Sequence, residues 1–166
     1  ILKTTDGGAN WTSMDTGVPG QFWASDAYNA SIAWAVGDNG VILKTTDGGA
    51  TGSPQISGTD GPLLSVQFLD SQVGWIAGRG ILHTTNGWDT WSSQDPGWPY
   101  SLHCIRFTDA NNGWAVGSDG ALGSAILHTS TAGLPGCVWA KRQPDGQPAN
   151  FGHIVVVEKH PGYIFV

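Results

Sequence analysis

Four aspartates are the candidates from which a pair of catalytic carboxyl groups could be formed: Asp38, Asp70, Asp109 and Asp119. Hydrolysis of a glycosidic bond needs two such groups about 5 to 9.5 Å apart, one as acid and one as nucleophile or base. Each of these aspartates, however, falls at a turn that recurs along the chain, where an aspartate commonly accepts backbone N–H bonds. We interpret them as turn-capping residues, which leaves a carbohydrate-active enzyme as the alternative.

Hydrolysis of an acidic sugar would require an arginine cluster for the sugar carboxylate, together with a Tyr/Glu nucleophile pair. The sequence offers Arg79, Arg106 and Arg142, and its single glutamate is Glu158. None of these residues lies in a pattern typical of a sialidase. A sialidase-like enzyme fragment is therefore only an alternative interpretation.

The five histidines show no spacing typical of a metal site. His83 and His128 occupy the repeat position of Lys3 and Lys44, so we expect both on the surface of strands. No serine lies in a nucleophile elbow, and no glycine-rich loop leads from a parallel strand into a helix. We therefore predict no metal, no cofactor and no enzymatic activity.

These residues are positioned by a repeat. The segment 1–9 returns almost unchanged at 42–50, more loosely from Ile81, and again from Ile126. The isoleucines that mark the register are 41, 39 and 45 residues apart, a period typical of units with four short strands. A Trp-Gly element precedes three of the copies, at 33–37, 74–78 and 113–117.

Each unit consists of runs of about four to six residues separated by Gly, Asp, Asn or Pro, which indicates an antiparallel meander. One such sheet cannot bury both faces, so the units must pack face to face around an axis. The sequence predicts an all-β fold, a β-propeller of four-stranded antiparallel blades, with about four blades or a partial arc of a larger propeller. The predicted units of this single domain are 1–18, 19–57, 58–97, 98–143 and a partial 150–166.

The two ends of the sequence raise the question of closure. Residues 154–157 and 163–166 are apolar runs suited to the first two strands of a blade, whereas the first residues suit the last two. Joined, they would complete a fourth blade, and the competing geometry is an open arc. Because the chain starts inside a repeat without a methionine, we expect a piece of a longer product.

Composition limits the partners. The formal net charge is −6 with only seven Lys and Arg, scattered singly, so we predict no nucleic-acid partner. No run approaches the length needed to span a bilayer, and we predict no membrane insertion.

The sequence has two cysteines, Cys104 and Cys137, and leaves open whether they form one disulfide or are two buried thiols.

The segment Thr4–Trp11 matches the Asp-box pattern Ser/Thr-x-Asp-x-Gly-x-x-Trp. With the elements around it, the chain up to Trp139 resembles the Asp-box (BNR-like) propellers, and among them the photosystem II stability and assembly factor family. The resemblance implies an extracellular, periplasmic or cell-surface location and a membrane-protein assembly intermediate as partner. We expect a structural role for the boxes, whose residues are Thr4, Asp6, Gly8, Trp11, Thr45, Asp47, Gly49, Thr84, Asn86 and Trp91.

In propellers, the loops that lead into the first strand and those that join the second and third strands gather on one face near the axis. There we predict a binding surface, because exposed aromatic rings beside Asp and Asn suit a peptide or a sugar. Its candidate residues are Arg79, Trp98, Tyr100, Trp23, Asp38 and Asp119. The predicted function is a non-catalytic module for protein binding, scaffolding or self-assembly, with a glycan-binding lectin as a further alternative.

Overall fold

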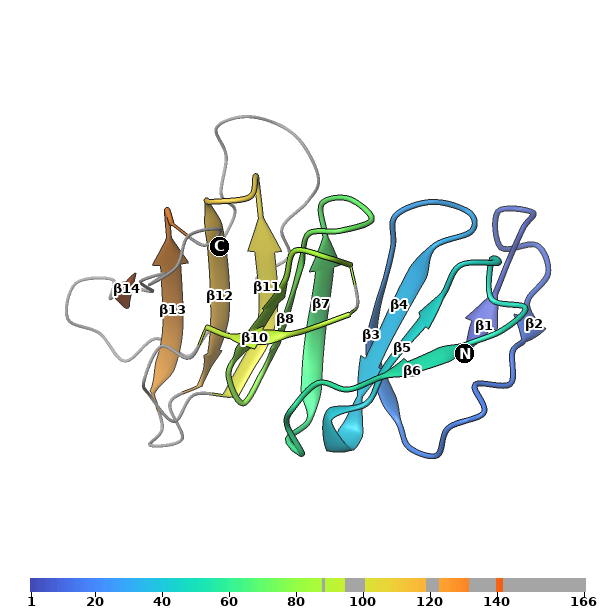
Figure 1. The fold of residues 1–166 in the computed structure, drawn as a ribbon, viewed down its shortest axis with the longest axis horizontal. Helices are drawn as coiled ribbons and strands as arrows, with labels where there is room; N and C mark the ends of the chain where they lie inside the picture. The colour runs from blue at the N-terminus through green and yellow to red at the C-terminus, as the bar shows by residue number, and fades with distance from the viewer. Residues whose placement is uncertain (88, 95–100, 119–122, 132–139, 142–166) are drawn as a thin grey trace.

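The computed structural model describes residues 1–87, 89–94, 101–118, 123–131 and 140–141. Within them it contains three four-stranded antiparallel sheets and one two-stranded hairpin, side by side in a row (Figure 1). In every sheet the strands lie in chain order. The predicted fold class, a β-propeller of four-stranded antiparallel blades, is confirmed, and the described sheets form a partial arc. The C-terminal runs 154–157 and 163–166 lie outside the described residues, so closure into four blades stays a prediction.

The strand bounds are as follows. The hairpin is β1 (Leu2–Lys3) and β2 (Thr12–Ser13). The first sheet is β3 (Phe22–Ala27), β4 (Ala33–Gly37), β5 (Ile42–Thr45) and β6 (Ser53–Gln55), with a 3-10 turn η1 (Asp38–Gly40) between β4 and β5. The second sheet is β7 (Leu63–Phe68), β8 (Gly74–Gly78), β9 (Ile81–Thr84) and β10 (Ser92–Ser93). The third sheet is β11 (Ser101–Phe107), β12 (Gly113–Ser118), β13 (Ser124–Thr129) and β14 (Ala140–Lys141).

The first strand of each sheet carries a β-bulge at the same place. The pairing shifts between Phe22 and Ala24 in β3, between Leu63 and Ser65 in β7, and between Leu102 and Cys104 in β11. A bulge adds one residue to one strand and increases the local twist. The three bulge residues, Trp23, Leu64 and His103, therefore occupy equivalent positions.

In the part of the chain that the structure describes, two apolar cores lie between successive sheets. Between the first and second sheets, the Trp34 ring stacks on Phe68 with centroids 3.5 Å apart and planes 7° from parallel. Between the second and third, Trp75 stacks on Phe107 at 3.7 Å and 12°. Because each tryptophan belongs to a second strand and each phenylalanine to the next sheet's first strand, one contact is repeated from sheet to sheet.

A side chain of the third strand packs on each second-strand tryptophan. The Lys44 ammonium lies 5.3 Å from the centre of the Trp34 ring, and the His83 ring stacks on Trp75 at 4.7 Å. His128 contacts Trp114 at 4.2 Å in a tilted arrangement. His83 is buried, so the expectation of a strand-surface residue is wrong for it. Its cross-strand partner is Trp75, which faces the interface between sheets rather than solvent.

The burial of His83 predicts a pH dependence of folding. Desolvation holds the pKa of His83 below its usual value of 6.5. Below pH 6.5 the unfolded chain binds a proton that the folded chain resists, so the free energy of unfolding must fall with decreasing pH. The loss is at most about 1.4 kcal/mol per pH unit for one proton.

We expect His83→Gln to flatten this slope in urea titrations at several pH values. His103→Gln, at an exposed position, is the matched control and should keep the wild-type slope. Equal slopes in His83→Gln and the wild type would contradict the assignment.

Candidate binding face

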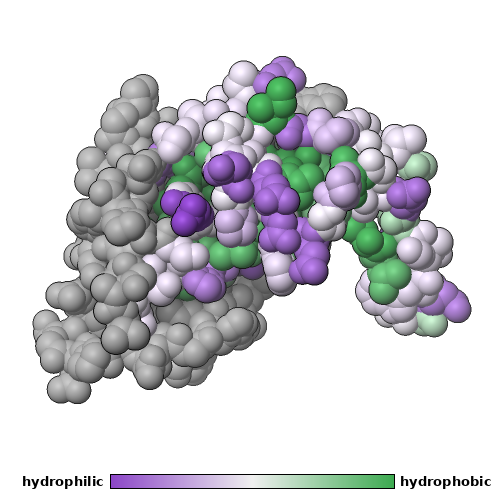
Figure 2. Space-filling model, turned by 90° about the horizontal axis from the view of Figure 1, so that it is seen from below, coloured by the Kyte–Doolittle hydropathy of each residue, from purple (hydrophilic) through white to green (hydrophobic). Residues whose placement is uncertain are grey.

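The loops that join second to third strands lie at one end of the sheets, together with the segments that lead into the first strands. In the described residues they are η1, the Arg79–Gly80 turn, and the segments 14–21 and 56–62. We call this end the loop face. It is the lower end of Figure 1 and is seen from below in Figure 2, where hydrophilic residues gather in the middle with hydrophobic residues on either side.

The η1 turn ties the first sheet to the second. The amide of Asp38 donates to the carbonyl of Gln21 at 3.0 Å, and the amide of Gly40 donates to the carbonyl of Gly61 at 2.9 Å. Gly40 has a φ of +68°, and a Cβ added there would lie 1.9 Å from the carbonyl oxygen of Thr59. Only glycine fits this position, because both the backbone conformation and the close approach exclude a side chain.

Two of the predicted binding residues meet on this face. The indole Nε1 of Trp23 donates a hydrogen bond to the Asp38 carboxylate at 2.7 Å, while 54% of the tryptophan remains exposed. The hydrogen bond fixes the ring and satisfies its only polar group. An anchored, exposed indole is a surface on which a peptide side chain or a sugar ring can stack.

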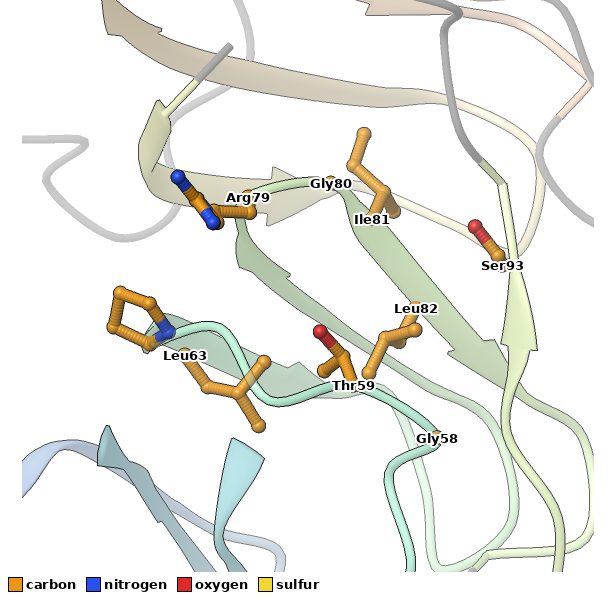
Figure 3. Close-up of a pocket in the computed structure, with 9 residues that line it drawn as sticks. Gly58, Thr59, Leu63, Arg79, Gly80, Ile81, Leu82 and Ser93 are labelled. Carbon is orange, nitrogen blue, oxygen red and sulfur yellow. The ribbon is translucent and has the colours of Figure 1, made fainter. Parts of the chain in front are cut away.

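Arg79 lies on the same face, in the second sheet, and is exposed. Its stem packs over Gly61, where an added Cβ would approach the Arg79 Cδ to 2.9 Å. Beside it is an open cavity of about 230 Å³, with Arg79 at one end and Ser93 at the other (Figure 3). The residues that line this cavity are Gly58, Thr59, Pro62, Leu63, Arg79, Gly80, Ile81, Leu82 and Ser93.

The sequence interpretation missed two residues that share the position of Trp23. Leu64 and His103 are the bulge residues of the neighbouring first strands, Leu64 half-buried and His103 exposed. Because β3, β7 and β11 are adjacent, the three side chains form a row of equivalent positions. Aligning the first strands by Phe22, Leu63 and Leu102, each of which directly precedes the bulge, would have revealed this row.

The remaining predicted binding residues, Trp98, Tyr100 and Asp119, lie outside the described residues. Glu158 and Arg142 lie outside them as well. Of the carboxylates considered for catalysis, Asp70 and Asp109 lie in the turns between first and second strands, at the opposite end from Asp38. They therefore do not form a pair with Asp38.

Asp70 and Asp109 cap their turns. Asp70 Oδ1 accepts the amides of Gln72 and Val73 at 2.6 and 2.8 Å. Asp109 Oδ1 accepts those of Asn111 and Asn112 at 2.8 and 2.9 Å. The Asn111 amide, with those of Asn112, holds the pKa of Asp109 below its usual value. A proton donor would need the opposite shift.

The turns between third and fourth strands, also at the end opposite the loop face, share one hydrogen-bond pattern. Asp47 Oδ1 accepts from the hydroxyl of Thr45 at 2.8 Å and from the amide of Thr51 at 2.9 Å, while the Thr45 hydroxyl accepts the amide of Gly49 at 2.7 Å. In the β1–β2 turn, Asp6 Oδ1 accepts from the Thr4 hydroxyl and the Asn10 amide, and the Thr4 hydroxyl accepts the Gly8 amide. In the β9–β10 turn, Asn86 Oδ1 accepts from the Thr84 hydroxyl and the Thr90 amide. Local bonds of this kind hold the turn shape.

The carboxylates of these turns are strongly stabilised in their charged form. The backbone and side-chain amides of Asn10 lower the pKa of Asp6 to about 2. The hydroxyl and amide of Thr51 hold the pKa of Asp47 well below its usual value of 3.8. These groups therefore add stability that is present above pH 3.8 and lost as the pH falls below it.

The tryptophans of these turns differ in burial. The Trp11 ring lies over Gly8, where an added Cβ would be 3.7 Å from it, but is 59% exposed. Trp91 is half-buried and meets Phe68 edge-on at 6.0 Å, so it contributes to the core between the first two sheets.

The Lys3 ammonium donates to the carbonyl of Gly48, which connects the β1–β2 hairpin to the first sheet.

Cys104 is a half-buried free thiol on β11, and Cys137 lies outside the described residues. Among the described residues, no three His, Cys, Asp or Glu side chains are grouped to hold a metal ion. In the same part of the chain, no helix has the length and hydropathy to span a membrane.

Comparison with solved structures agrees with the fold. No family model matches the sequence, and no curated protein matches it either. The structure is similar to "YCF48 bound to D1 peptide", with a TM-score of 0.63 and 26% identity over 77% of this chain and 42% of that one. It is also similar to YCF48 from Cyanidioschyzon merolae, with a TM-score of 0.64 and 22% identity over 80% of this chain and 43% of that one.

The fold is a β-propeller. The chain spans less than half the length of either solved neighbour. The similarity therefore covers a part of each of these solved chains and not their whole length.

The Gly40 contact predicts a position-specific effect on stability. We expect Gly40→Ala to lower the free energy of unfolding by more than about 1 kcal/mol, because the new Cβ would strike the Thr59 carbonyl at a positive φ. Gly80→Ala is the control, since Gly80 lies in the equivalent turn of the second sheet with nothing within 4 Å of an added Cβ. Urea denaturation of both variants checks this, and equal stabilities would contradict it.

The Asp47 turn predicts a difference between two substitutions. Asp47→Ala removes both acceptors and should lower the melting temperature at pH 7, whereas Asp47→Asn keeps one acceptor, as Asn86 does in the next sheet, and should lower it less. Below pH 3.8 both variants should approach the wild type, because the wild-type carboxylate then loses its advantage. Thermal melts across this pH range are the measurement, and a gap that widens in acid would refute the assignment.

Proposed function

We propose that this protein is a non-catalytic, protein-binding β-propeller of the Asp-box type, similar to the photosystem II stability and assembly factors, and that its loop face binds a peptide segment of a partner. The observation that carries the proposal is the anchored Trp23 ring beside Asp38, on the same face as the exposed Arg79. The Trp23 ring offers an apolar surface for stacking, and the Arg79 guanidinium offers several hydrogen-bond donors. This combination suits peptide binding better than catalysis.

The comparison with YCF48 supports the proposal. One of the similar structures is described as bound to a D1 peptide, so a protein with this kind of sheet arrangement binds a peptide. An extended peptide presents backbone carbonyls and carboxylates, to which the guanidinium of Arg79 can donate hydrogen bonds. Apolar side chains of the peptide can pack on the Trp23 ring or insert into the cavity beside Arg79.

The alternative of a glycan-binding lectin rests on the same tryptophan. An exposed ring beside a carboxylate can stack on a sugar and accept its hydroxyls. Here, however, one oxygen of Asp38 already accepts the Trp23 indole, and a neutral sugar has no carboxylate to pair with the Arg79 guanidinium. The peptide therefore fits the loop face better than a sugar does.

Binding of a fluorescent D1 peptide, measured by anisotropy, tests the proposal. We expect saturable binding that Arg79→Gln weakens at least about tenfold, the equivalent of about 1.4 kcal/mol for lost charge-assisted hydrogen bonds. Trp23→Ala should weaken it as well. Trp11→Ala is the matched control, because Trp11 is also exposed but lies at the opposite end of the sheets.

The outcomes separate the alternatives. Absence of binding, or equal affinity in the wild type and both loop-face variants, would overturn the proposal. Binding to neutral oligosaccharides that depends on Trp23 but not on Arg79 would favour a lectin. Turnover of aryl glycosides that is lost in Asp38→Asn would favour an enzyme.

A further inference from the structure

The two complete interfaces between sheets follow one plan. In each, a second-strand tryptophan stacks on a phenylalanine of the next first strand, as Trp34 does on Phe68 and Trp75 on Phe107. A polar side chain of the earlier first strand also bonds the backbone of that phenylalanine. Asp26 accepts the amide of Phe68 at 2.6 Å.

The second interface repeats this bond with a different side chain. Gln67 Oε1 accepts the amide of Phe107 at 2.5 Å, and Gln67 Nε2 donates to the carbonyl of Phe107 at 3.1 Å. Asp26 and Gln67 are equivalent, since they pair across their sheets with Trp34 and Trp75. The plan therefore fixes both the side-chain stack and the register of the next strand.

The third sheet carries the same components on a face that no other sheet of the described residues covers. Trp114 pairs with Arg106 and with His128, in the register of Trp34 and Trp75. Yet Trp114 is 38% exposed, whereas Trp34 and Trp75 are 1% and 0% exposed. Arg106 is exposed too, and its Nη1 donates to the carbonyl of Ile105 in its own strand at 2.7 Å. We call the surface around Trp114 and Arg106 the open face.

We propose that the open face is the docking surface for residues 151–166 of the same chain, which would form the first strand and the start of the second strand of another sheet. The sequence register supports this occupant. In the second sheet, Leu63 is followed seven residues later by the capping Asp70 and eleven residues later by Gly74 before Trp75. The third sheet repeats this spacing with Leu102, Asp109, Gly113 and Trp114, and the C-terminal segment repeats it with Phe151, Glu158, Gly162 and Tyr163.

The length of the connection supports it as well. The β1–β2 hairpin corresponds to a third and a fourth strand, because Leu2 pairs with Ser13 as Leu43 does with Pro54 and Leu82 with Ser93. Ser13, Pro54 and Ser93 are each followed nine residues later by the residue before the bulge of the next first strand, namely Phe22, Leu63 and Leu102. In the third sheet the equivalent residue is Lys141, opposite Leu127. Phe151 follows it by ten residues, so the chain has the length to reach the open face as it does in the earlier sheets.

The register names the expected contacts. Val156 stands five residues after Phe151, as Phe68 does after Leu63 and Phe107 after Leu102, so it would pack on the Trp114 ring. Arg106 would donate to the carbonyl of residue 156, as Gln67 does to that of Phe107. Because successive side chains of a strand face opposite sides, Val155 would point away from Trp114.

Fluorine NMR of the full chain labelled with 5-fluorotryptophan tests this proposal. The Trp114 resonance is assigned by its loss in Trp114→Phe. We expect Val156→Glu to shift this resonance and to increase its solvent-isotope effect, because a buried carboxylate would expel the strand. Val155→Glu, the matched control with the same charge on the other side of the strand, should leave the Trp114 resonance unchanged.

Every outcome decides for or against the proposal. If Val156→Glu does not fold, Val156→Ala replaces it and should produce a smaller shift in the same direction. A Trp114 resonance unaffected by changes at residue 156, or equally affected by changes at residue 155, would overturn the proposal. A Trp114 shift that depends on protein concentration and not on residue 156 would also overturn it, and would assign the open face to a second copy of the chain.

Discussion

The contact between a second-strand tryptophan and the phenylalanine of the next sheet is the interaction on which the structure depends. A four-stranded sheet cannot bury both of its faces by itself, so each sheet needs a neighbouring sheet against its apolar face. The stacks of Trp34 on Phe68 and of Trp75 on Phe107 bury both rings, and the side chains of Asp26 and Gln67 set the register beside them. The arc is therefore built one interface at a time, as in other repeat proteins.

The loop face is a consequence of this packing. Since the sheets stack with their first strands adjacent, the turns between second and third strands converge on the segments that lead into those strands. Gly40 and Asp38 bond the neighbouring backbone there, and this rigid base presents Trp23. Residues that differ between repeats, such as Arg79, lie on the loop face, whereas the repeated Thr and Asp residues hold the turns at the opposite end of the sheets.

Much of this architecture could be predicted from the sequence, because strands and turns are local features. The recurrence of Ile marks the third strands, that of Trp-Gly the second strands, and that of Asp-Gly or Asn-Gly the tight turns, without knowledge of distant contacts. The environment of His83 could not be predicted in this way. The sequence places it at the repeat position of a lysine, but its burial depends on Trp75 and on the packing of the next sheet. The Trp23–Asp38 bond likewise depends on a bulge that leaves no clear composition signal.

A double-mutant cycle on Trp75 and Phe107 tests the central claim most directly, namely that the sheets are held together by this repeated stack. The free energies of unfolding of Trp75→Leu, Phe107→Leu and the double variant would be measured in urea. The account predicts a coupling energy of about 0.5–1.5 kcal/mol between the two residues, and near zero between Trp75 and Phe68, which do not stack on each other. Additive effects at Trp75 and Phe107 would contradict the account.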